Sequence, residues 1–391
     1  MKKLKKILMI TLPAILAVGG ILFVLLQPLL SFAQYTPYSG DNKFERRPAS
    51  YDGSRKTVII VADNKVTEMF DMLAPYTLFN LTGKLNVFIV AKEKLPIRIK
   101  KDLFVLPQFT FAEIDSLKIP ADVIVLPATS ARDEKQDPVV MSFIKAHFTD
   151  STRMLSVCDG ASTAAATGFY DGLPITCHAS DINHMKDHFK KPVWVQNMNV
   201  SHTANLYSTA GVSNAVEGAL TIIRDMIGEN TMKAVADSIS YPHSGISVSH
   251  KSIPLKFGNY LTIINKVIFR KNRKIGLVID DGINEFEMAS VLDTYARTFP
   301  RSFSAITTSD STVTTKYGLT LVHTGGRSET KLDEIHIIGT ASDLNGVVPA
   351  GAEIIRYDFK GSYPIEVCLK RIKEVYGPKF HNAVKLTLDY N

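Results

Sequence analysis

The sequence predicts an α/β protein in which helices cover a parallel sheet, followed by a second and smaller unit of the same kind. Short apolar runs rich in β-branched residues alternate with segments of helical period from Lys56 onward, which is typical of parallel strands joined by helices. The same alternation starts again at Lys274. The length of 391 residues also suits two globular domains better than one.

The first unit is predicted to cover residues 56–242. Its first strand, 57–61, is an unbroken β-branched run, as expected where both faces of a strand are buried. Asp137 and Pro138 suit the N-cap and the first position of a helix. The remaining elements follow in order, with strands at 85–90, 122–127, 153–157, 175–178 and 206–211 and helices at 68–81, 138–148, 161–167 and 213–227.

Residues 274–391 are interpreted as a shortened repeat of the first unit. The repeat has no counterpart of the cysteine turn described below, and Cys368 lies within a helical stretch, where we expect it to be part of the core. We therefore expect this second copy to be structural, either replacing a dimer partner, so that the protein is a monomer, or forming a lid. The stretches that carry the comparison are 274–282, 285–292, 333–339 and 364–377.

The segments outside the two units point to export. Residues 1–34 combine a lysine-rich start with an apolar run from 7 to 33, and crossing a bilayer takes about 20 such residues. The lysines should stay cytoplasmic, so we expect a single-pass membrane anchor with an extracytoplasmic globular part, joined by a flexible tether at 35–55. Residues 31–33 also resemble a signal-peptidase site, and cleavage there would give a secreted protein. The connector, 243–273, is apolar and then basic, which suits either a membrane surface or inter-domain packing.

Composition excludes several classes of function. The net charge of +7 is mild and the globular part has no long Lys/Arg run, so we expect no nucleic-acid partner. Three cysteines cannot form a disulfide framework. No Cys or His cluster has zinc spacing, and we predict neither a metal nor an organic cofactor.

The segment most indicative of chemistry surrounds Cys158. An apolar strand, 153–157, runs into Asp159 and Gly160 and then into a helix of small residues. A sharp strand-to-helix turn exposes the residue at its bend, and the first helical turn directs N–H groups and a partial positive charge at the sulfur. This pattern favours a nucleophile elbow, although a buried cysteine packing as a small hydrophobe remains the alternative.

Candidate partners for the thiol lie at the same predicted edge of the sheet. Asp71 belongs to the first helix, where a protonated carboxyl could donate a hydrogen bond to the sulfur. His178 follows a short strand and could move protons. The alternatives are a solvated aspartate and a structural histidine. Groups that could face an oxyanion or a substrate are Ala128, Thr129, Asp159, Gly160 and Gly211.

Four motifs then carry a family resemblance. They are DMLAPY at 71–76, SVCDGA at 156–161, GLPITCH at 172–178 and STAGVS at 208–213. In this order and spacing, the chain from 56 to about 240 resembles the PfpI superfamily, also called class I glutamine amidotransferase-like. Within it, the chain is most similar to isonitrile hydratase and to the amidase-like sensor domain of AraC-type regulators.

The resemblance implies a fold and a site. The fold would be a flavodoxin-like three-layer α/β/α sandwich with a parallel sheet. Cys158 would be the nucleophile, Asp71 its acidic partner and His178 a nearby histidine.

The chain also departs from the family pattern. A glycine pair usually follows the strand that ends here at Pro127, and Ala128-Thr129 has less backbone freedom. Asp159 replaces a small neutral residue or threonine, and its carboxylate should raise the thiol pKa. Cys177, beside His178, could pair with Cys158 outside the cell. The helix-turn-helix domain of the related regulators has no counterpart, since the shortened repeat stands in its place.

These observations leave three hypotheses. The first is a membrane-anchored, thiol-dependent hydrolase, hydratase or deglycase that acts on a small molecule or a modified protein. The second is a non-catalytic ligand sensor or scaffold without a DNA-binding domain. The third is a thiol-oxidation sensor in which Cys177 resolves oxidised Cys158. The cysteine, aspartate and histidine favour the first, whereas Asp159 and Ala128-Thr129 favour the second.

Overall fold

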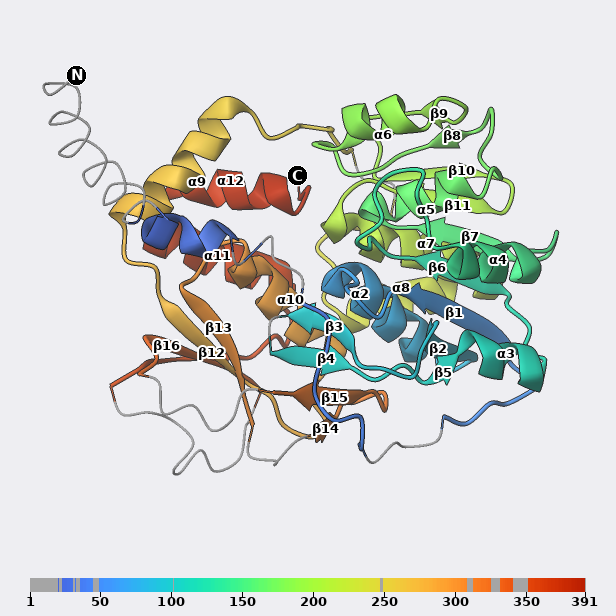
Figure 1. Cartoon of the computed structure of the whole chain (residues 1–391), viewed down its shortest axis with the longest axis horizontal. Helices are drawn as coiled ribbons and strands as arrows, with labels where there is room; N and C mark the ends of the chain where they lie inside the picture. The colour runs from blue at the N-terminus through green and yellow to red at the C-terminus, as the bar shows by residue number, and fades with distance from the viewer. Residues whose placement is uncertain are drawn as a thin grey trace, which may run out of the picture.

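The computed structural model places two helix-covered sheets side by side (Figure 1). The residues that it describes are 20, 23–30, 32, 36–44, 49–100, 102–246, 249–307, 312–324, 331–339 and 351–390. Most of the predicted membrane segment, 1–34, therefore lies outside the described residues. Among the residues that are described, no helix has the length and apolar character needed to cross a membrane.

The first unit is built on a seven-stranded sheet in the order β10-β11-β7-β6-β1-β2-β5. Every neighbouring pair is parallel except β10 and β11, which are antiparallel. The strands are β1 (Lys56–Ala62), β2 (Leu85–Ala91), β5 (Phe109–Thr110), β6 (Val123–Leu126), β7 (Arg153–Ser156), β10 (Val200–Thr203) and β11 (Leu206–Thr209). The prediction of an α/β protein with a largely parallel sheet is confirmed.

Helices cover both faces of this sheet. Val58 and Ile60 of β1 join one apolar core, whereas Ile59 and Val61 join the other, as expected from the two-residue repeat of a strand. The first core includes α2 (Met69–Leu81), α7 (Ala215–Ile227) and α8 (Glu229–Ser238). The second includes α3 (Phe111–Leu117), α4 (Pro138–His147), α5 (Ala161–Ala166) and α6 (Ile182–His188). A two-stranded parallel ribbon, β8 (Pro174–Ile175) and β9 (Val193–Trp194), lies outside the main sheet.

The second unit has a smaller parallel sheet in the order β13-β12-β16-β17. Its strands are β12 (Lys274–Val278), β13 (Ser302–Ile306), β16 (Glu334–Ile338) and β17 (Glu353–Tyr357). Its helices are α10 (Glu285–Ala296), α11 (Pro364–Tyr376) and α12 (Pro378–Thr387). Cys368 on α11 is fully buried, which confirms its predicted place in the core.

A third sheet joins the two units, and the sequence did not predict it. Its order is β14-β15-β4-β3, with β3 (Ile97–Lys100) and β4 (Leu103–Val105) from the first unit and β14 (Thr312–Thr314) and β15 (Thr320–His323) from the second. These strands are short, and the antiparallel pairing of β15 with β4 links residues more than two hundred positions apart.

The two units also share one hydrophobic core. Helix α2 packs against α10, and the rings of Phe70 and Phe286 lie 5.6 Å apart between their centroids. The same core cluster contains residues from both sheets. The connector contributes α9 (Phe257–Phe269), which packs against α12.

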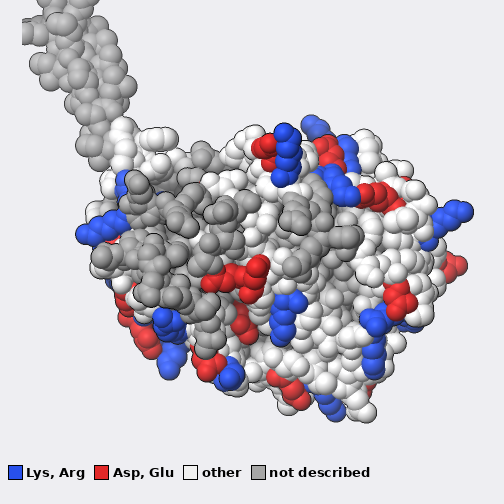
Figure 2. Space-filling view, turned by 90° about the horizontal axis from the view of Figure 1, so that it is seen from below, with Lys and Arg blue, Asp and Glu red and all other residues white. Residues whose placement is uncertain are grey.

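Surface charge agrees with the mild net charge. On the face shown in Figure 2, basic and acidic side chains are interspersed over largely uncharged surface. Among the described residues on this face, Lys and Arg do not gather into one patch.

Candidate functional site

The sharp turn predicted at Cys158 is present. Strand β7 ends at Ser156, and a single 3-10 turn, Cys158–Gly160, leads directly into α5. Cys158 has a φ of 55°, a left-handed conformation that is strained for any residue with a side chain. Gly160 permits this turn because a Cβ there would lie 1.9 Å from the carbonyl oxygen of Leu126, at the end of β6.

The thiol is buried rather than exposed as the elbow pattern predicted. Cys158 retains 5% of its accessible surface, and Asp71 and His178 retain 0% and 6%. All three cysteines are free thiols. Sγ of Cys177 donates to the carbonyl of His178 at 3.6 Å instead of pairing with Cys158. Access to the thiol from solvent therefore requires movement of the surrounding chain.

Asp71 lies on the first turn of α2 and is a buried acid, not a solvated surface residue. Its Oδ2 accepts the backbone N–H of Ala128 at 3.0 Å, while its own N–H donates to the N-cap side chain of Glu68 at 2.7 Å. Within the described part of the chain, Oδ1 is buried without a hydrogen-bond partner. Burial raises the pKa of Asp71 well above its ordinary value, and the neighbouring Glu68 raises it further. These effects favour the protonated form of Asp71, which can donate one hydrogen bond.

The surroundings of Cys158 favour the thiol over the thiolate. Burial raises the pKa of Cys158 well above its ordinary value, and the carboxyl groups of Asp71 and Asp159 add to this effect. Burial also raises the pKa of Asp159 to about 6, against the attraction of Arg132. Arg132 forms ion pairs with Asp159 and, at 2.5 Å, with Asp181. This guanidinium partly offsets the negative charge beside the sulfur.

His178 belongs to the same cluster of charges. Its Nδ1 accepts the N–H of Ser180 at 3.1 Å and lies 3.3 Å from Oδ2 of Asp181. Burial alone would lower the pKa of His178, but the hydrogen bond to Asp181 and the charge of Asp389 raise it above its ordinary value. His178 and Asp159 therefore interact electrostatically with each other, and both interact with the carboxylate of Asp181.

Several of the amides predicted to face an oxyanion are already engaged. The N–H of Ala128 holds Asp71, the N–H of Gly160 donates to Val157 at 2.8 Å, and the N–H of Gly211 donates to Asn214 at 3.2 Å. The hydroxyl of Thr129 accepts from Ala131 at 3.3 Å. Donation to an oxyanion by Thr129 and Asp159 stays a prediction.

The second unit supplies a buried cation to this site. Arg297, at the end of α10, forms an ion pair with Asp293 and lies 3.9 Å from Oε1 of Glu68. Lys100 of β3 approaches Asp293 at 3.5 Å, so the ionic cluster spans the boundary between the units. Arg297 also interacts electrostatically with Cys158, and it would stabilise a thiolate there.

The C-terminal segment closes the other side of the site. The Asp389 carboxylate accepts the N–H of Ala179 at 3.1 Å and lies 3.4 Å from Nε2 of His250. A Cβ on Gly211 would lie 2.0 Å from the Cβ of Asp389. The glycine predicted to bind substrate therefore makes room for the C-terminus of the same chain.

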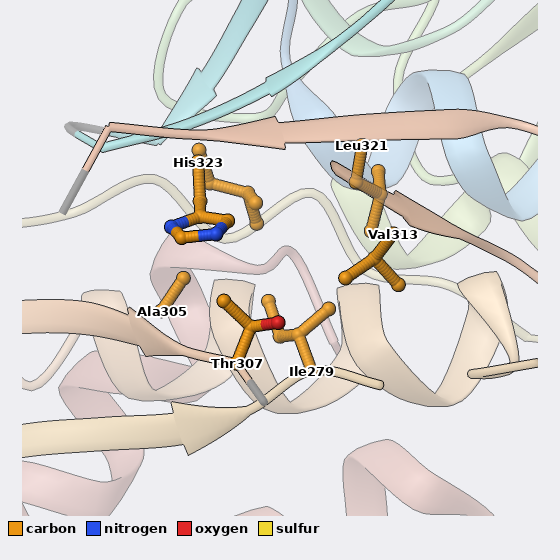
Figure 3. Close-up of a pocket in the computed structure, with 7 residues that line it drawn as sticks. Ile279, Ala305, Thr307, Val313, Leu321 and His323 are labelled. Atoms are coloured by element: carbon orange, nitrogen blue, oxygen red, sulfur yellow. The ribbon is translucent and has the colours of Figure 1, made fainter. Parts of the chain in front are cut away.

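A small apolar pocket lies elsewhere, between the joining sheet and the second unit. Figure 3 shows His323, Val313 and Leu321 on one side of it and Ala305, Thr307 and Ile279 on the other. None of the predicted site residues lines this pocket. We place the candidate chemistry at Cys158, where reactive groups converge.

Comparison with known proteins identifies the family of the first unit. The model of the DJ-1/PfpI family matches residues 55–225. This part of the chain belongs to the DJ-1/PfpI family. The isonitrile hydratase of Pseudomonas putida is 23% identical to it over 175 residues, which are 44% of this chain and 74% of the relative.

Solved structures match the DJ-1/PfpI domain as well. DJ-1 of Schizosaccharomyces pombe is 19% identical with a TM-score of 0.41, and DJ-1beta of Drosophila melanogaster is 18% identical with a TM-score of 0.43. Each match covers 48% of this chain and 100% of the other. A THiJ/PfpI family protein from Pseudomonas syringae is 17% identical with a TM-score of 0.42, over 54% of this chain and 83% of its own.

The sequence pointed to the residues at the sheet edge and missed those that surround them. The ends of α2, β6 and β7 bring Asp71, Ala128 and Cys158 into one buried region. Glu68 had a local signal, because it stands three residues before Asp71 at a helix start. Arg297 and Asp389 had none, since only the packing of the second unit brings them here.

Proposed function

We propose that the DJ-1/PfpI domain is a thiol-dependent hydratase, hydrolase or deglycase for a small molecule or a modified protein. The observation that carries the proposal is the strained Cys158 at the elbow, together with Asp71, a buried acid whose Oδ1 has no partner among the described residues. Backbone strain of this kind persists where the surrounding structure enforces it, and it is frequent at active sites.

The chemistry would begin with addition of the thiol to an electrophilic carbon. Sγ forms a bond to that carbon, and one π bond between the carbon and a heteroatom breaks. The electron pair goes to the heteroatom, which takes the Asp71 proton, and the thiol proton of Cys158 restores the acid. At a carbon–nitrogen multiple bond, water then adds across the remaining π bond, with its oxygen bonding to the carbon and one proton going to nitrogen. The carbon–sulfur bond breaks as a carbon–oxygen double bond forms, and the hydroxyl proton goes to sulfur, which leaves as the thiol. Cys158 is regenerated and one water is consumed.

The class of substrate follows from the site and from one relative. The buried site suits a compact, uncharged molecule. Because a relative carries the name isonitrile hydratase, we would first test hydration of small carbon–nitrogen multiple bonds. His178 would transfer protons between the site and solvent.

A ligand sensor or scaffold is the second candidate, and a specific observation favours it. Cys158 is almost fully buried, and burial raises its pKa, so the resting protein holds an unreactive thiol. A domain that uses this region to recognise a ligand, without reacting with it, would have these properties.

We further propose that the second unit is a reduced copy of the first and takes the place of a dimer partner, leaving the protein a monomer. The order of elements supports this proposal. The second unit runs β12, α10, β13, β16, α11, and the first unit has the matching order β1, α2, β2, β6, α7. Strand β12 also lies between β13 and β16 as β1 lies between β2 and β6. The contact between α2 and α10 would then correspond to one between two subunits.

We also propose that the N-terminal segment holds the globular part at the extracytoplasmic face of a membrane. The support is the sequence pattern of residues 1–34. Flotation of the full chain with lipid vesicles, resistant to alkaline extraction, tests this proposal separately from the chemistry.

The pH dependence of alkylation tests the enzymatic proposal. Iodoacetamide labelling of the full chain, mapped by mass spectrometry, should modify Cys158 below about pH 8, while Cys177 and Cys368 serve as internal buried controls. Asp71→Asn should shift the Cys158 profile to lower pH, because the carboxyl of Asp71 raises the pKa of the thiol. If Cys158 is labelled no faster than Cys368 below about pH 8, the enzymatic proposal is wrong and the ligand sensor or scaffold remains.

A further inference from the structure

Helix α9 carries an apolar stripe on its outer face. Phe257, Tyr260, Leu261 and Ile264 recur at intervals of three and four residues and so lie on one side of the helix. Their exposed fractions are 76%, 48%, 48% and 38%, and Phe269 at the helix end is 76% exposed. A run of large exposed apolar side chains on one helix face indicates a contact surface.

The opposite face of α9 already holds the helix to the protein. Ile263 and Val267 are buried, and α9 packs against α12. The ammonium of Lys266 donates to the carbonyls of Thr298 and Phe299, at 2.5 and 3.3 Å. The exposed stripe is therefore not needed for docking of the helix.

The charge around α9 suits a negatively charged surface. No Asp or Glu occurs between residues 238 and 279, whereas this stretch contains Lys251, Lys256, Lys266, Arg270, Lys271, Arg273 and Lys274. Lys256 and Arg270 flank the helix and are both exposed. Lys271 and Arg273 pair with acidic residues of the second unit, so we assign the attraction to the flanking pair. An exposed apolar stripe with basic residues at its ends is typical of helices that lie in the headgroup region of a bilayer.

The apolar N-terminal segment meets the globular part next to this helix. The ring of Phe32 lies 5.1 Å from that of Phe299, the residue whose carbonyl accepts a hydrogen bond from Lys266 of α9. Figure 1 shows the described part of this segment, in blue, at the same end of the molecule as α9. Phe23 and Val24 there are 63% and 52% exposed. Two apolar surfaces thus lie on the same side of the protein.

We propose that α9 lies flat on an anionic lipid bilayer with Phe257, Tyr260, Leu261 and Ile264 inserted among the headgroups. The inference rests on the proposed membrane location and adds a second contact to it. Two contacts on one side would fix the orientation of the globular part relative to the bilayer. A helix stripe used for a second copy of the chain would need no lipid, and this difference decides the test.

The experiment measures the depth of a nitroxide on the full chain. Single labels are placed at Leu261→Cys and, as the matched control, at Val139→Cys, an exposed apolar position on α4 of the first unit that is 43% accessible. Cys158→Ser is included in both variants, because Cys158 is the native thiol expected to react, and Cys177 and Cys368 are buried. Mass spectrometry confirms a single label. The protein is reconstituted into vesicles of phosphatidylcholine with phosphatidylglycerol, and the accessibility of each label to oxygen and to a nickel chelate is compared.

We expect the label at 261 to become more accessible to oxygen and less accessible to nickel, while the label at 139 stays aqueous. If the protein floats with the vesicles but the label at 261 is as accessible to nickel as the label at 139, the inference is overturned. The proposal of an N-terminal membrane anchor is then unaffected. If the protein does not float, both proposals fail. Shielding of position 261 from both reagents, equal with and without vesicles and accompanied by spin–spin broadening, would overturn the inference in favour of a second copy.

Discussion

Replacement of Arg297 by methionine should destabilise the protein and make Cys158 less reactive. Arg297 is 7% exposed, and the carboxylate of Asp293, with which it pairs, is on a residue that is 1% exposed. Removing one partner of a buried ion pair typically costs about 3–5 kcal/mol. We expect a loss near the lower end, about 3 kcal/mol, because Lys100 still lies 3.5 Å from Asp293. Urea unfolding followed by circular dichroism measures this loss.

The double replacement Arg297→Met with Asp293→Leu separates the pair from general damage. The double variant removes both charges of the pair and leaves Lys100 and Glu68, whose opposite charges attract each other, so it should recover part of the stability that the single variant loses. Arg55→Met, at an exposed ion pair with Asp52, is the matched control and should leave the urea midpoint nearly unchanged. A loss for Arg297→Met no larger than that of the control, or no recovery in the double variant, would refute the reasoning.

Three further predictions concern the same region. Burial and the charge of Asp293 raise the pKa of Glu68 to about 7 from an ordinary 4.5, so the folded state binds this proton more tightly and stability should fall as pH rises between these values. Urea midpoints at about pH 5 and pH 8 should show this fall, and Glu68→Gln should reduce it. Gly160→Ala should destabilise the protein by at least about 1–3 kcal/mol in urea unfolding, since its Cβ meets the Leu126 carbonyl. Gly211→Ala should displace Asp389 and speed alkylation of Cys158, and an unchanged rate would contradict closure of the site by the C-terminus.

The sequence predicted the parallel sheet because its strands carry their own signal. Strand β1 is a continuous β-branched run, and α2 begins within one residue of its predicted start. The joining sheet was missed for the opposite reason. Its strands have three or four residues each, and β4 pairs with β15 of the other unit, which no local pattern predicts.

The candidate site was predictable where short motifs fix local geometry. Cys158, Gly160 and Asp71 stand in a strand–turn–helix and at a helix start, patterns that can be recognised without knowing the fold. Exposure of the thiol was not predictable, because it depends on what packs over the turn. Arg297 follows α10, and Asp389 follows α12. No sequence pattern near Cys158 predicts that either residue lies close to it.

The closed site gives the second unit a chemical role besides a structural one. Burial and carboxyl neighbours oppose ionisation of Cys158, and Arg297 of the second unit is one of the cations that favour it. Asp389 in turn raises the pKa of His178, again from the second unit. Movement of the second unit would therefore change the charge around both Cys158 and His178. The reactivity of this DJ-1/PfpI domain should for that reason depend on contacts that lie outside residues 55–225.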